Sequence, residues 1–254
     1  MSWSDQKIKN HTGAAKILGQ IKDEILNFIK NHAQTSELEV QNFAGQRFKN
    51  YKLKNEIAKP IIAFRQNTSQ VHYFPSKQTN KRLRPNSLIL IDIWGRLKNR
   101  GAPYADLTWI AYLKNQKYNS KFKNKEKEIK KAIDIVFNAR DLQIAFIKKG
   151  LKHKILPTGK EIDSIGRDYI HRMGFEGKFL HGTGHELGFH SPHGLGRRIY
   201  PKNHRPIKIN IGYTIEPGVY LAGKFGARSE INFYIDKNWQ LVITTPVQKK
   251  LDLI

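Results

Sequence analysis

Four acidic residues stand inside segments whose other residues are mostly apolar, as in buried β-strands. They are Asp92 in residues 88–94, Asp106 in 104–110, Glu216 in 211–220 and Glu230 in 227–235. A carboxylate among apolar side chains is costly unless it is paired or bound to a metal. A Gly- and Lys-rich turn separates the first two segments, which predicts an antiparallel hairpin with Asp92 and Asp106 near each other.

The stretch 181–194 holds four of the ten histidines and four glycines, which let the backbone approach a ligand closely. His185 and Glu186 resemble the start of the H-E-x-x-H helix of zinc proteases. The next histidine, His190, comes one residue too late and would lie roughly 140° around a helix from His185. Gly182 and Gly184 would each cost about 1 kcal/mol in a helix, so a strand or loop is predicted for 181–185.

The order of the predicted elements indicates the fold class. Helices are expected over 14–29, after the capping box of Ser36 and Glu39, over 122–150, and from the capping box of Thr158 and Glu161 to Gly174. Segments 211–220 and 227–235 each have the composition of one strand interrupted by a glutamate. Pairs of helices that alternate with groups of strands are typical of an α+β fold, here with two similar halves.

The composition limits the possible partners. The formal charge is +24, and a basic surface attracts phosphate. The lysines are spread over the whole chain and no nucleic-acid-binding signature is present, so a solvated basic surface is favoured and nucleic acid is the alternative partner. We expect a cytoplasmic protein, because no apolar run approaches the roughly 20 residues of a membrane span and the start lacks a signal-peptide core.

The acids and one histidine together suggest a metal centre. The candidate ligands are Asp92, Asp106, His185, Glu216 and Glu230. Two divalent cations would neutralise four carboxylates, whereas one would leave the site strongly anionic. The chain has no cysteine, and oxygen ligands with one imidazole favour manganese, cobalt or iron(II), with zinc as a further option.

The same motifs resemble those of the pita-bread metallopeptidases, the family of methionine aminopeptidase, aminopeptidase P, prolidase and creatinase. The resemblance covers nearly the whole chain. The matching motifs are Ile91-Asp92, Tyr104-Ala105-Asp106-Leu107-Thr108, His181-Gly182-Thr183-Gly184-His185, Thr214-Ile215-Glu216-Pro217-Gly218-Val219-Tyr220 and Gly226-Ala227-Arg228-Ser229-Glu230. It implies a pita-bread (creatinase/aminopeptidase) fold, with two pseudo-symmetric αβ halves around a curved antiparallel sheet and residues 1–254 as a single catalytic domain.

The resemblance also implies roles for the site residues. Asp92 would chelate one ion, Asp106 and Glu230 would bridge two, and His185 and Glu216 would complete the second. The ions would activate a water for attack on a peptide carbonyl, and Glu216 would take its proton. Three catalytic histidines are expected, His72, His181 and His193. They would stabilise the oxyanion and assist the leaving amine.

The sequence leaves the branch of the family open. The motifs around Glu216 and Glu230 favour an Xaa-Pro aminopeptidase, whereas the length matches methionine aminopeptidase, and a non-catalytic nucleic-acid- or ribosome-binding module is the rival from another class. Trp109 and an extended turn at 98–100 are expected to reshape the substrate pocket, and His190 competes with His193 for its role. The remaining histidines are expected at the surface, at positions 11, 32, 153, 171 and 204.

Overall fold

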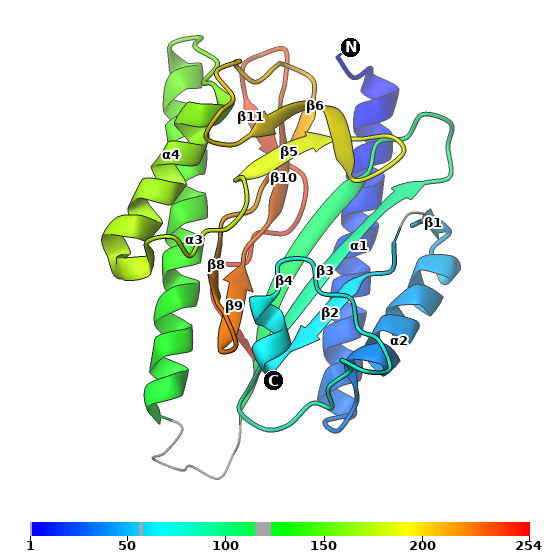
Figure 1. Ribbon diagram of the computed structural model, residues 1–254. Coiled ribbons are helices and arrows are strands. Elements are labelled where there is room, and N and C mark those ends of the chain that lie inside the picture. Colours follow the sequence, from blue (N-terminus) through cyan, green and yellow to red (C-terminus); the bar gives the residue numbers. More distant parts are fainter. Residues whose placement is uncertain (1, 56–57, 115–122) are drawn as a thin grey trace.

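In the described residues, four α-helices form where periodicity and capping residues predict them. The computed structural model describes residues 2–55, 58–114 and 123–254 (Figure 1). The helices are α1 (Asp5–Asn31), α2 (Glu37–Asn50), α3 (Lys123–Lys152) and α4 (Gly159–Ile170). Both capping boxes are present, with Ser36 and Thr158 as the N-cap residues of α2 and α4. After α4 a single π-helical turn ends the helical region, and Gly174 in it has a positive φ of 90° that favours glycine.

The first sheet is built on the predicted hairpin. Its strands are β1 (Leu53–Lys54), β2 (Ile61–Phe64), β3 (Ser87–Leu97), β4 (Ala105–Leu113) and β12 (Asp252–Leu253). Strands β3 and β4 are antiparallel, with Asp92 opposite Thr108 and Trp94 opposite Asp106. Because side chains alternate along a strand, Ile91 and Leu107 pack in the core with α1 and α2 while Asp92 and Asp106 face the other way. An antiparallel sheet was expected. The sheet departs from this in one place, because the short β12 runs parallel to β4.

The second sheet supplies the opposite half of the molecule. Its order is β11-β10-β7-β5-β6, and its strands are β5 (Gly184–Leu187), β6 (His193–Ile199), β7 (Gly212–Ile215), β10 (Ile231–Ile235) and β11 (Leu241–Ile243). Its apolar residues form one core cluster with residues of α3 and α4. In Figure 1 the pair α1 and α2 lies on one side of the molecule and the pair α3 and α4 on the other, with the strands between them. The α+β prediction with two similar halves is therefore confirmed.

The sequence suggested one strand for each of segments 211–220 and 227–235. In the structure neither segment is a single strand. After β7 the chain leaves the second sheet, forms the hairpin of β8 (Gly218–Leu221) and β9 (Phe225–Arg228), and returns as β10. Pro217 has no N–H to donate to a ladder, which favours a break at that point. Glu216 and Glu230 therefore lie at the two places where the chain passes between the sheet and the hairpin.

His11 is buried, although a surface position was expected. Its ring nitrogens lie 2.9 Å from the carbonyl oxygen of Tyr104 and 2.7 Å from the hydroxyl of Thr244, and its exposed fraction is 0%. Position 11 continues the inner stripe of α1, three residues before the buried Ala14. The other four histidines of that group are exposed as predicted.

Within the described residues, the structure contains no helix that is long and apolar enough to cross a membrane.

Candidate metal centre

The five predicted ligands come from both halves of the fold and meet in one cavity. Asp92 and Asp106 project from the β3–β4 hairpin, His185 from β5, and the two glutamates from the ends of β7 and the start of β10. The cavity has a volume of about 410 Å³, and its lining includes Asp92, Asp106, His185, Glu216 and Glu230. The fold thus brings together the five predicted ligands, which are separated by up to 138 positions in the chain.

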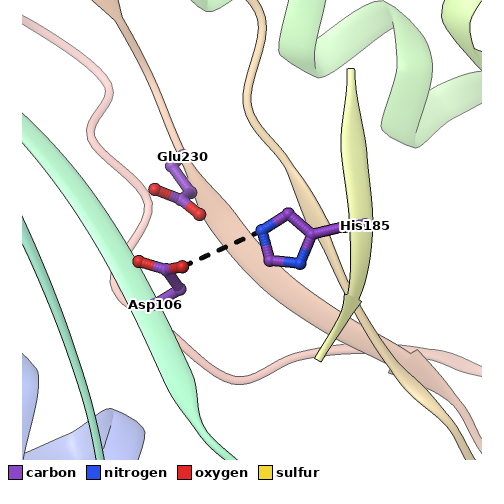
Figure 2. A group of neighbouring side chains, drawn as sticks. All are labelled: Asp106, His185 and Glu230. Carbon is purple, nitrogen blue, oxygen red and sulfur yellow. Dashed lines mark ion pairs between the residues drawn. The ribbon is translucent and has the colours of Figure 1, made fainter. Parts of the chain in front are cut away.

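Three of these residues form the closest group. Asp106, His185 and Glu230 are buried, and each offers one ligand atom within 4.8 Å of those of the other two (Figure 2). The Nε2 atom of His185 lies 3.9 Å from Oδ2 of Asp106 and 3.4 Å from Oε1 of Glu216. Figure 2 shows the three side chains pointing toward one another, with Asp106 on β4, His185 on β5 and Glu230 directly before β10.

Buried polar atoms without a hydrogen-bond partner make these residues suitable ligands for a metal ion. Within the described part of the chain, Asp106 Oδ1, His185 Nε2 and Glu230 Oε1 are buried and have no hydrogen-bond partner. Native proteins rarely leave such atoms unsatisfied unless a ligand or water takes them up. Carboxylate oxygens and one imidazole nitrogen are donors that suit a divalent transition metal. The three unpaired atoms belong to the same three residues that converge in Figure 2.

The carboxylates repel one another in this setting. Burial raises the pKa of Asp106 and of Glu230 well above the usual range, and the neighbouring carboxylates raise both further. Burial also raises the pKa of Glu216 to about 7, although the positive charge of Arg228 opposes the shift. A bound cation would relieve this repulsion by supplying the missing positive charge.

Asp92 already has a cationic partner. Its carboxylate accepts a hydrogen bond from the guanidinium of Arg228, in an ion pair that is almost fully buried. Arg228 also donates to the hydroxyls of Thr108, at 3.0 Å, and Tyr220, at 3.2 Å, and Thr108 in turn donates to Glu230 at 2.7 Å. No role was predicted for Arg228 from the sequence, where the available signal was a single arginine in the mostly apolar segment 227–235.

The backbone around the ligands is fixed by further hydrogen bonds. The hydroxyl of Thr214 accepts from the backbone N–H of His185 at 3.0 Å and donates to Glu216 at 3.0 Å. A side chain at Gly184 would overlap the carbonyl oxygen of Thr214, so glycine is required for this close approach of β5 to β7. The side-chain oxygen of Asn232 accepts a hydrogen bond of 2.8 Å from the backbone N–H of Asp106.

Besides His185, three histidines line the same cavity, and His190 is not among its lining residues. The rings of His193 and His185 lie 4.1 Å apart, and His181 Nε2 lies 2.8 Å from the hydroxyl of Tyr220. His72 and His193 are partly accessible to solvent, and both line the cavity. Burial, reinforced by the positive charge of Arg228, lowers the pKa of His181 to about 3, so this ring is neutral at pH 7. The geometry places His193, rather than His190, at the cavity.

Neither expected modifier of the pocket reaches it. Trp109 faces away from the cavity, since its indole N–H donates to Asp252 at 2.7 Å and its ring packs under the ammonium of Lys22. In the turn after β3, Asn99 donates to Asn10 of α1. Neither Trp109 nor residues 98–100 line the cavity, so the expectation that they reshape the pocket is wrong. The alternation of β4 directs Trp109 to the α1 face.

Comparisons with known proteins agree with this geometry. A model of metallopeptidase family M24 matches residues 9–237. An uncharacterized peptidase of Methanocaldococcus jannaschii is 26% identical over 251 residues, which cover 91% of this chain and 61% of the relative. An X-Pro aminopeptidase from Thermotoga maritima superposes with a TM-score of 0.83 at 23% identity, covering 100% of this chain and 65% of that one.

A prolidase from Thermococcus sibiricus gives a TM-score of 0.79 at 25% identity, covering 99% of this chain and 62% of that chain. The expected pita-bread fold is confirmed by these structural matches. This chain spans less than two thirds of the length of each of these three relatives.

Proposed function

Because the chain belongs to metallopeptidase family M24, we propose that it is an aminopeptidase that uses two divalent metal ions to remove the first residue of a peptide. The observation that carries this proposal is the convergence of four carboxylates and His185 on one cavity, with three buried ligand atoms left unpaired. Such a donor set in a concave site is expected of a metallohydrolase.

Two ions are favoured by the number of ligands. Arg228 offsets one of the four carboxylate charges, so charge balance by itself no longer distinguishes one ion from two. A catalytic ion usually takes about three protein ligands and keeps a position open for water or substrate. Five protein ligands therefore favour two ions, of which manganese, cobalt and iron(II) suit the donor set and zinc is a further option.

The protein groups around the ions can perform the remaining chemistry. When bound, the ions would polarise the peptide carbonyl and lower the pKa of a water. Glu216 has a pKa of about 7 before metal binding and is placed to accept a proton, while His72, His181 and His193 line the same cavity. We assign to these histidines the stabilisation of the oxyanion and the protonation of the leaving amine.

The proposed substrate is a peptide with proline at its second position. The relatives that share the fold include an X-Pro aminopeptidase and a prolidase. Proline removes the amide N–H and fixes φ, so a site that accepts it can rely on ring packing. Apolar side chains are available for such packing, since Ile61, Phe74 and Trp94 line the cavity.

Two measurements test the proposal. Titration calorimetry with manganese or cobalt on chelator-treated protein should give two ions per chain, and anomalous diffraction should place both among the five ligands. We expect kcat/KM to be higher on Ala-Pro-Ala than on Met-Ala-Ser. A clear preference for the methionyl peptide would assign the protein to the methionine aminopeptidase branch. Salt-dependent RNA binding without any peptidase activity would favour the non-catalytic alternative.

A further inference from the structure

Glu37 is the first residue of α2, and its side chain is completely buried. Four groups of residues 64–81 donate hydrogen bonds to it. These are the backbone N–H groups of Phe64 and Lys81, both at 2.7 Å, the side-chain amide of Asn67 at 3.0 Å and the hydroxyl of Tyr73 at 2.6 Å. The Glu37 carboxylate therefore binds both ends and the middle of the segment 64–81.

This segment forms one wall of the candidate active site. It runs from the end of β2 through a short 3₁₀ helix, Arg65–Ser69, and has no strand between residues 70 and 86. Val71, His72 and Phe74 line the cavity, whereas Tyr73 points the opposite way and is 2% exposed. Tyr73, one of the four residues that donate hydrogen bonds to Glu37, is thus the immediate neighbour of His72.

His72 has little other support. It is exposed, and the segment around it is attached to the rest of the site by a hydrogen bond of 2.9 Å from the backbone N–H of Gly226 to Thr68 and a longer one of 3.4 Å from Arg228 to the carbonyl of Val71. Both contacts lie on the N-terminal side of His72. On the C-terminal side, Tyr73 is held by Glu37, Asn67 and the carbonyl of Thr79.

We propose that Glu37 is a positioning residue of the active site, which holds His72 at the cavity through Tyr73. This inference rests on the proposed peptidase function. The cost of burying a carboxylate is considerable unless its oxygens are fully hydrogen-bonded, and here every donor comes from the segment that carries His72. Neither Glu37 nor Tyr73 lines the cavity, so their effect on catalysis has to pass through that segment.

A double-mutant cycle tests the coupling. Glu37→Gln keeps the size of the side chain but turns one acceptor into an amide that faces donors, and Tyr73→Phe removes the hydroxyl alone. In the wild-type background we expect Glu37→Gln to lower kcat/KM by about ten- to a hundredfold, because a displacement near 1 Å can have such an effect. In a His72→Ala background the same substitution should lower it by less than about threefold. Metal stoichiometry should stay unchanged in all variants.

The control separates positioning from general destabilisation. Val40→Ala truncates a buried core residue of the same helix and should lower the melting temperature without a His72-dependent loss of kcat/KM. If Glu37→Gln lowers kcat/KM equally in both backgrounds, or if His72→Ala leaves kcat/KM unchanged in an active enzyme, the proposal is wrong.

Hydrogen exchange supplies a readout that does not depend on peptide cleavage. Glu37→Gln should speed amide exchange in residues 65–81 while exchange in α3 stays as in the wild type. Should the wild-type protein cleave no peptide, the proposed function fails, and unchanged exchange in 65–81 would then overturn the anchoring by Glu37 as well.

Discussion

Asp92 and Arg228 form a buried ion pair at the edge of the candidate metal centre, with side-chain exposed fractions of 9% and 5%. The pair joins the β3–β4 hairpin to the end of β9, residues that are 136 positions apart in the chain. It gives the cluster of carboxylates one resident positive charge. The stability of the site should therefore depend both on this arginine and on added cations.

Replacing Arg228 with Gln should make folding depend more strongly on divalent metal. The substitution leaves Asp92 as a buried carboxylate without its partner, which typically costs about 3–5 kcal/mol. Manganese would supply part of the lost positive charge. We expect the rise in melting temperature between chelator and manganese to be larger for the variant than for the wild type. Arg47→Gln breaks the more exposed pair with Glu24 and serves as the control; an equal rise in all three proteins would contradict the prediction.

Replacing Glu216 with Gln should abolish most of the activity while the fold persists. The change removes both a ligand charge and the proposed proton acceptor, and we expect turnover at saturating metal to fall at least about a hundredfold. Circular dichroism should be unchanged. Glu186→Gln is a matched control, because Glu186 bonds to the backbone of Arg197 and does not line the main cavity. Turnover within a few fold of the wild type would show that Glu216 does not have this role.

The sequence predicted which acids and histidine come together better than it predicted what surrounds them. An acid in an apolar strand is a local signal, and alternation along β3 and β4 was sufficient to bring Asp92 and Asp106 to one face. The pairing of Arg228 with Asp92 depends on how the β8–β9 hairpin meets the first sheet, which no local pattern encodes. The same limit explains why Glu216 and Glu230 were assigned to strand interiors, although they lie where the chain leaves and rejoins the second sheet.

Side-chain direction explains the remaining errors. Trp109 was expected near the substrate because it follows the Asp106 motif, but counting alternation from Asp106 would have directed it to the α1 face. His11 was expected at the surface, although its position continues the buried stripe of α1. In both cases the periodicity of the element indicates the correct side of the chain.

Replacing Trp109 with Phe should lower stability without changing substrate choice. The substitution removes the partly buried hydrogen bond from the indole N–H to Asp252, at a cost of about 1–2 kcal/mol. Urea unfolding should detect this loss. The ratio of kcat/KM on Ala-Pro-Ala to that on Met-Ala-Ser should stay within about twofold of the wild-type ratio, because the ring lies on the far face of β4. A marked change in the ratio would show that Trp109 does affect the substrate pocket.

His11 should make the protein less stable in mild acid. Burial lowers its pKa to about 4 in the folded protein, although the hydrogen bond to the Tyr104 carbonyl opposes the shift, and the ordinary value of 6.5 applies to the unfolded chain. Between these two values the unfolded chain binds a proton that the folded protein excludes. The free energy of unfolding therefore decreases as the pH falls below about 6.5, and the loss is complete near pH 4 at about 3 kcal/mol.

The variant His11→Gln isolates this effect, because glutamine can still offer a donor and an acceptor between Tyr104 and Thr244 but does not titrate. Urea unfolding of both proteins in chelator, at pH 7 and pH 4.5, gives the stability difference between them at each pH. The wild type should lose part of its advantage over the variant on acidification, by roughly 2 kcal/mol over this interval. Because every other titrating group is common to both proteins, an equal difference at the two pH values would mean that His11 takes up its proton as readily in the folded protein as in the unfolded chain.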